Sequence, residues 1–151
     1  MTTAPANNAD KAPEDRILGT LPVWDLTDLY PGNDSPELNA DLDRVAKDAA
    51  AFSGSYKGKL SGLSGKALGA AIAEYEAIDE IMGRIMSYAQ LVYAGNVSDP
   101  DVGRFYQTMQ ERVNDISAHV LFFALELNEI DDKVLAKQLK AAESGRYKPW
   151  V

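Results

Sequence analysis

A seven-residue apolar repeat in the C-terminal half of the chain constrains the fold more than any other feature. Apolar side chains in residues 100–127 follow alternating steps of four and three, and residues 64–94 carry a matching series. Such spacing places them on one face of an α-helix. The short link 95–99 therefore predicts an antiparallel hairpin of two helices, each on the order of 40 Å long. The repeat consists of Leu68, Ala71, Tyr75, Ile78, Met82, Ile85, Ala89 and Val92, then Val102, Tyr106, Met109, Val113, Ile116, Val120, Phe123 and Leu127.

Two shorter helices are predicted on either side of this hairpin. Residues 36–52 follow Ser35, a good N-cap, and begin with Pro36, which suits the first helical turn. Residues 131–142 form the other, and the Gly- and Ser-rich stretch 53–62 is predicted to be a connector. No alternating run of β-branched residues indicates a strand. The predicted fold is all-α, a long antiparallel helical hairpin with flanking shorter helices. The apolar face of residues 36–52 comprises Leu38, Leu42, Val45, Ala49 and Phe52.

The N-terminal region divides into a leader and an anchor. Residues 1–16 lack large apolar side chains after Met1, so we expect a flexible leader, and residues 17–151 are predicted to form one helical domain. Residues 21–32 concentrate large apolar side chains and end at a Pro-Gly turn signal. We expect this segment to be an irregular anchor that docks on the helices through Trp24 and Tyr30, because both combine a large apolar surface with a polar tip.

The hairpin carries more apolar surface than one seam requires. Helices that are apolar on all sides are usually buried on all sides, and the two flanking helices are not expected to cover the whole surplus. The chain also ends on Trp150 and Val151, whereas natural termini are usually polar, so it has the look of a truncated sequence. The sequence therefore predicts an exposed apolar face that belongs against a missing domain. The surplus side chains are Ile81, Tyr88, Leu91, Leu121, Phe122 and Leu125.

Composition excludes several kinds of chemistry and partner. The chain has no Cys and one His, so it offers no thiol nucleophile, no thiolate metal site and no multi-histidine zinc site. Its net charge of −8 argues against nucleic acid and against anionic membrane surfaces as partners. It carries no export signal and no stretch long enough to span a membrane, so we expect a cytoplasmic protein.

The remaining polar candidates favour structural roles. His119 has Asp115 one helical turn away, but a structural or partly exposed helix histidine explains it without a metal. Acidic pairs could serve as general acid and base, yet they fall among helix-surface charges or at a helix start. No phosphate-binding glycine motif is present. We therefore predict no catalytic, cofactor-binding or metal-binding residue in this chain. The acidic pairs are Glu74/Glu76, Asp79/Glu80 and Asp131/Asp132.

Five blocks from residue 21 to the end resemble, in the same order, successive blocks of the oligoendopeptidase F family, relatives of thimet oligopeptidase. The first is similar to that family's W-D-L-S/T-D-L-Y-P opening. One block would be weak, but five in order are fairly specific. The blocks are Trp24-Asp-Leu-Thr-Asp-Leu-Tyr-Pro31, Tyr56-Lys-Gly-Lys-Leu60, Glu74-Tyr-Glu76, Gly83-Arg-Ile-Met-Ser-Tyr-Ala89 and Leu121-Phe-Phe-Ala-Leu-Glu-Leu127.

The resemblance implies the N-terminal, channel-covering helical region of a cytoplasmic zinc peptidase that cleaves short peptides. In that family the zinc ligands and the catalytic glutamate come from H-E-x-x-H and a further glutamate, in a domain far downstream. This chain contains no H-E-x-x-H, so it is expected to be inactive alone, with the downstream catalytic domain as its partner and oligopeptides as substrate of the whole enzyme. The alternative is an independent helical-hairpin interaction module whose wide apolar face binds a partner.

Overall fold

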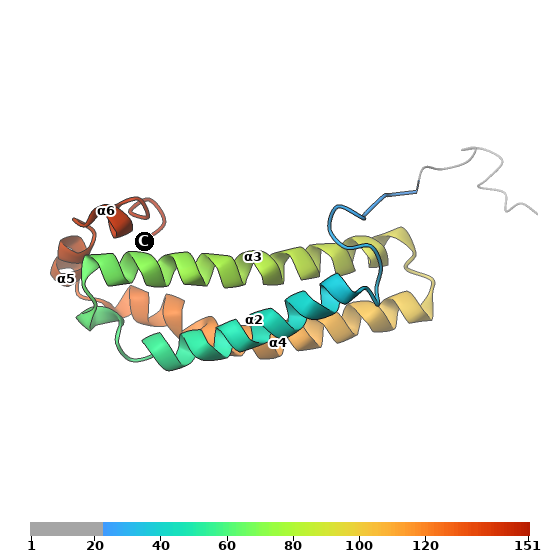
Figure 1. Cartoon of the computed structure of the whole chain (residues 1–151), viewed down its shortest axis with the longest axis horizontal. Coiled ribbons are helices and arrows are strands. Elements are labelled where there is room, and N and C mark those ends of the chain that lie inside the picture. The colour runs from blue at the N-terminus through green and yellow to red at the C-terminus, as the bar shows by residue number, and fades with distance from the viewer. Residues whose placement is uncertain (1–22) are drawn as a thin grey trace, which may run out of the picture.

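Three long helices lie side by side in the computed structural model, which describes residues 23–151 (Figure 1). They are α2 (Pro36–Tyr56), α3 (Gly65–Gly95) and α4 (Pro100–Glu129). Helices α3 and α4 form the predicted antiparallel hairpin, and α2 runs along it in the same direction as α4. The described part of the chain contains no strand, so the predicted all-α hairpin with flanking shorter helices is confirmed. The predicted leader, residues 1–16, lies outside the described residues.

Each long helix begins at a side-chain N-cap, and the predicted cap Ser35 is confirmed. The Ser35 hydroxyl accepts a hydrogen bond from the Leu38 amide at 3.3 Å, and the Ser64 hydroxyl accepts one from the Ala67 amide at 3.2 Å. The Asp99 carboxylate accepts from the Asp101 amide at 2.8 Å. Each cap satisfies an amide that has no partner within its own helix.

The predicted connector 53–62 is partly wrong. Helix α2 continues through Gly54 to Tyr56, and a single 3-10 turn, η2 (Leu60–Gly62), follows it. Phe52 and Tyr56 pack together, with ring centroids 4.9 Å apart, and this contact extends the helix by one turn beyond the predicted end at residue 52. The chain then turns at Gly58, whose φ of 77° lies in the left-handed region that glycine tolerates best.

The predicted helix 131–142 is also wrong, because it divides into α5 (Asp132–Gln138) and α6 (Ala142–Gly145). Residues 132–151, here called the corner, fold back onto the start of α3. A Cβ atom at Gly65 would lie 2.2 Å from the Gln138 carbonyl oxygen, and one at Gly69 would lie 2.5 Å from the Glu143 carbonyl carbon. Two glycines one helical turn apart therefore let the corner backbone approach α3 closely.

Buried polar groups hold the corner in this position. The Gln138 side-chain amide donates to the carbonyl oxygens of Leu60 and Leu63, both at 2.9 Å. The fully buried Ser144 hydroxyl donates to the Gln138 carbonyl oxygen at 2.7 Å. These bonds connect the corner to η2 and α5 to α6; the Leu60 and Gln138 carbonyls each accept a backbone amide as well, from Leu63 and Ala141.

Helix α2 covers much of the apolar surplus that the sequence assigns to a missing domain. All five predicted apolar residues of α2 are buried, and Phe52 lies 5.7 Å from Phe122 and 5.2 Å from Phe123 between ring centroids. Phe122 is therefore 8% exposed, and Ile81 and Tyr88 are buried as well. The prediction that these three side chains form an exposed face is wrong; Leu91 is half-buried, and Leu121 and Leu125 are exposed.

Among the helices of residues 23–151, none has the length and apolar character needed to cross a membrane.

Candidate functional site

The segment before α2, residues 23–35, crosses α3 as an irregular strap anchored by Tyr30. The Tyr30 side chain is 2% exposed and meets the Tyr88 ring edge-on, with centroids 5.4 Å apart. Its hydroxyl donates to Asp41 Oδ2 at 2.8 Å, and Asp41 also accepts from Arg84 at 3.3 Å. Burial and the hydrogen bond to Asp41 raise the pKa of Tyr30 well above its usual value. Tyr30 is thus an anchor, as predicted.

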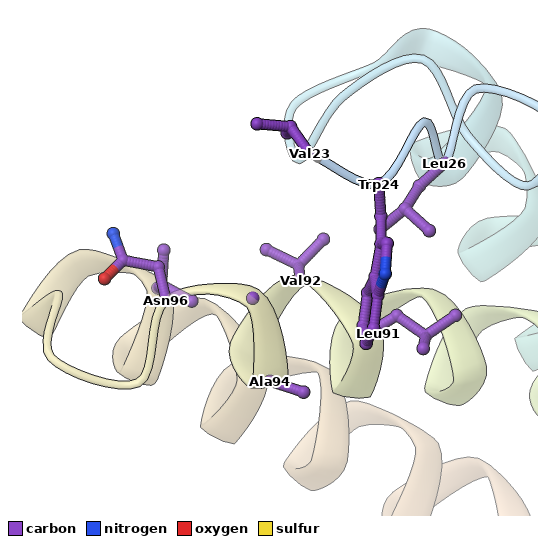
Figure 2. Close-up of a pocket in the computed structure, with 9 residues that line it drawn as sticks. Val23, Trp24, Leu26, Leu91, Val92, Ala94 and Asn96 are labelled. Carbon is purple, nitrogen blue, oxygen red and sulfur yellow. The ribbon is translucent and has the colours of Figure 1, made fainter. Parts of the chain in front are cut away.

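Trp24 does not share that role, so this half of the anchor prediction is wrong. Its side chain is 58% exposed, while Leu26 and Leu29 of the same strap are half-buried against the core. Figure 2 shows the Trp24 ring descending from the strap beside Leu91 at the end of α3. Trp24 lines an open pocket and is not buried in the core.

This pocket has a volume of about 510 Å³ and lies between the strap and the turn that joins α3 to α4. Figure 2 shows Val23 on the strap above it, Val92 on α3 pointing up into it, and Asn96 at its far side. Pockets of this size accommodate small organic molecules or a few side chains. The strap and residues 91–102 are together called the tip. The pocket is lined by Val23, Trp24, Leu26, Leu91, Val92, Ala94, Gly95, Asn96 and Val102.

The walls of the pocket are apolar, but the chain around them is acidic. Asp25 stands between two lining residues of the strap, and its carboxylate accepts from the Thr27 hydroxyl at 2.7 Å and the Thr27 amide at 3.0 Å. These hydrogen bonds lower the pKa of Asp25. Neither residues 23–43 nor residues 85–103 contain Lys or Arg. The tip therefore presents negative charge beside an apolar cavity.

The polar candidates singled out from the sequence lie elsewhere. His119 and Asp115 are both exposed on α4, and the residues of each acidic pair are exposed too. Asp131 caps α5 by accepting from the Lys133 amide at 3.0 Å, in agreement with its predicted helix-start role. Glu74 accepts from the Tyr56 hydroxyl at 2.8 Å, which gives it a structural partner.

A zinc ion fits none of these positions. Within residues 23–151 no three His, Cys, Asp or Glu side chains gather in a geometry that could hold a metal. His119 with Asp115 offers two ligands at most, and a catalytic zinc needs three from the protein. No reaction step is therefore assigned to a metal on this part of the chain.

Sequence reasoning missed the pocket and the bonds that position its strap. Leu91, Val92 and Val102 look like ordinary members of an apolar helix face. Asp41 and Arg84 stand far apart in the chain, so no local spacing predicts their contact. The one available signal is that residues 23–43 and 85–103 both lack Lys and Arg, which could have indicated that the two segments share a surface.

Neither protein-family models, nor curated proteins, nor solved structures give a match to this chain.

Proposed function

We propose that this chain is the N-terminal, channel-covering helical region of an oligoendopeptidase F-like zinc metalloendopeptidase that hydrolyses short peptides in the cytoplasm. It would shape access to the substrate channel and would not be catalytic by itself. The zinc ion and the catalytic glutamate of such an enzyme belong to its downstream domain. The observation that carries the proposal is that each of the five resembling blocks contacts another of them, at one end of the bundle or the other.

The second block contacts the third and the fifth. The Tyr56 hydroxyl donates to Glu74 Oε1 at 2.8 Å, and burial together with this bond raises the pKa of Tyr56 to about 12. The Gly58 amide donates to Glu126 Oε1 at 2.6 Å. Residues that are far apart in the sequence thus join α2, α3 and α4 at one end of the bundle.

The first block contacts the fourth at the other end. Tyr30 packs against Tyr88, and both Tyr30 and Arg84 donate to Asp41. The Tyr88 hydroxyl in turn donates to Asn33 at 3.0 Å. The first and fourth blocks therefore pack the strap against α3, and this contact supports the proposal in addition to the similarity of the sequences.

The reading frame of the natural gene beyond codon 151 tests the proposal directly. We expect an H-E-x-x-H downstream, and we expect the full-length protein to cleave an internally quenched oligopeptide. Chelation of zinc should abolish that cleavage, and so should Gln in place of the motif's glutamate. A stop codon after Val151 in the intact gene would overturn the proposal.

The second candidate is an independent interaction module, and the open tip pocket favours it. Its apolar lining and the exposed Trp24 suit a binding surface. Under this alternative the chain binds its partner without any downstream domain. Stoichiometric zinc and co-purifying peptidase activity in the isolated chain would contradict both candidates.

A further inference from the structure

We propose that the tip pocket is a docking site for a basic peptide segment that carries a bulky apolar side chain. This inference goes beyond the peptidase proposal and does not depend on it. The apolar side chain would enter between Val23, Val92 and Asn96, and its Lys or Arg neighbours would face the carboxylates of the strap.

Two large apolar side chains that line the pocket are exposed. Val23 is 93% exposed and Trp24 58%. Water covers these large side chains although they adjoin a concave surface lined mostly by other apolar groups. An entering apolar side chain would displace that water, and burial of the exposed apolar surface would favour binding.

Among the described residues, the two segments that line the pocket carry carboxylates and no Lys or Arg. Asp25 and Asp28 are exposed on the strap, and residues 23–43 and 85–103 are free of Lys and Arg. Asp101 at the start of α4 pairs with Arg104, but the strap carboxylates have no such neighbour in their own segment. Complementary charge speeds encounter and rejects like-charged partners, so a basic segment fits and an acidic one does not.

The same charges disfavour a second copy of this chain as the occupant. A symmetric dimer would bring the same surface of both copies together. Strap would then face strap, with Asp25 and Asp28 of one copy against those of the other. The pocket therefore suits a partner of opposite charge.

The two tryptophans of the chain allow a direct test. Trp24 lies in the pocket, whereas Trp150 is 53% exposed in the corner at the other end of the molecule (Figure 1). In Trp150→Phe the only tryptophan is Trp24, and in Trp24→Phe it is Trp150. Each variant is titrated with a peptide of Lys and Leu that lacks Trp and Tyr. We expect a saturable blue shift of Trp24 emission and no shift of Trp150 emission.

Matched peptides and charge variants sharpen the result. Peptides with Glu in place of Lys, or Ser in place of Leu, should not bind. Asp25→Asn with Asp28→Asn keeps the acceptor for Thr27 and should weaken binding about fivefold, since each exposed charge pair contributes about 0.2–1 kcal/mol. Glu76→Gln with Glu80→Gln removes the same charge from the exposed face of α3 and should leave affinity unchanged.

Three outcomes would overturn the proposal. One is a Trp24 emission that does not respond to the Lys-Leu peptide. Another is equal binding of the Glu-Leu peptide. The third is a Trp24 emission that is already blue-shifted before peptide is added. If that blue shift depends on protein concentration, a second copy of the chain occupies the pocket. If it does not, the chain's own residues occupy it.

Discussion

The corner and the tip close opposite ends of the same helical bundle by different means. At the corner, backbone lies directly on backbone, because Gly65 and Gly69 have no side chain to hold α5 and α6 away from α3. At the tip, the strap is held through the side chains of Tyr30, Asp41 and Arg84, and a pocket stays open beside it. Close backbone packing excludes side chains from the contact between Gly69 and α6, although pockets of about 440 and 380 Å³ lie beside the corner as well. The tip pocket of about 510 Å³ differs in lying under a strap that is held by side chains.

Charge follows the same division. Apart from Lys47, every lysine of the described residues lies at the corner end, in or beside the end of α2, the start of α3 and the corner itself. The tip segments contain none, and the neighbouring Arg84 and Arg104 each pair with an aspartate. The two ends would therefore attract different partners, and a basic segment should choose the tip.

Breaking the corner should have the largest effect. Gly69→Ala places a Cβ atom 2.5 Å from backbone of α6, so the corner must move as a whole. We expect the free energy of unfolding to fall by about 3 kcal/mol, the upper part of the range for overpacking. Urea denaturation followed by circular dichroism measures the change.

Gly83→Ala is the matched control on the same helix. Gly83 is exposed, and a Cβ atom there would meet nothing within 4 Å. Alanine has the higher helix propensity, so this variant should be more stable by about 0.5–1 kcal/mol. If both variants lost stability equally, the close approach at Gly69 would not be what fixes the corner.

Breaking the strap anchor should cost less. Asp41→Ala leaves the buried Tyr30 hydroxyl without its acceptor, and we expect a loss of about 2 kcal/mol. Asp43→Ala, on the same helix, removes a 71% exposed carboxylate that pairs with Arg112 at 3.5 Å, and it should change stability by less than about 0.5 kcal/mol. An equal loss in the two variants, measured by thermal unfolding, would contradict the anchor.

Alkaline pH should loosen the same bonds more gently. The pKa values of Tyr30 and Tyr56 are raised in the fold, so both rings stay neutral there above pH 10, where the unfolded chain ionises. Their contribution is therefore constant below pH 10 and is lost as pH rises through the raised values. Chemical denaturation at successive pH values should show this decline, and Tyr30→Phe with Tyr56→Phe should make it shallower. If the free energy of unfolding of the double variant declined with pH as steeply as that of the unaltered chain, Tyr30 and Tyr56 would not be the groups responsible.

The smallest effect is expected on the exposed face of α4. Leu121 and Leu125 are 62% and 57% exposed, so Leu121→Gln with Leu125→Gln should change stability by less than about 0.5 kcal/mol while reducing self-association at high concentration. Phe122→Gln, at the neighbouring position, removes a ring packed on Phe52 and should cost more than about 3 kcal/mol. Sedimentation and urea denaturation distinguish the two; similar stability losses would contradict the assigned faces.

The sequence predicts what local spacing determines. The apolar residues of α2 and the hairpin follow from steps of three and four, and the cap Ser35 follows from a residue that suits a helix start. Each of these depends on neighbours within about two helical turns.

The features that the sequence did not predict depend on contacts between segments that are far apart in the chain. Phe122 is an off-seam residue in the sequence, and only the packing of α2 along the hairpin buries it. The division into α5 and α6 follows from the close approach of the backbone to Gly65 and Gly69, and the Ser144 hydroxyl stabilises it by donating to the Gln138 carbonyl oxygen. The pocket arises where Trp24 fails to enter the core, which no periodicity reveals.

Hydrogen exchange of single amides tests the central claim, that the strap opens by itself and the corner only with the whole bundle. The Leu29 and Tyr30 amides donate to the Leu26 carbonyl, and the Gly145 amide donates to the Ala141 carbonyl. We expect the strap amides to exchange well below the global free energy of unfolding, faster still in Asp41→Ala, and more slowly with the Lys-Leu peptide bound. Gly145 should exchange only at the global value. Strap and corner amides that exchange together would contradict the account.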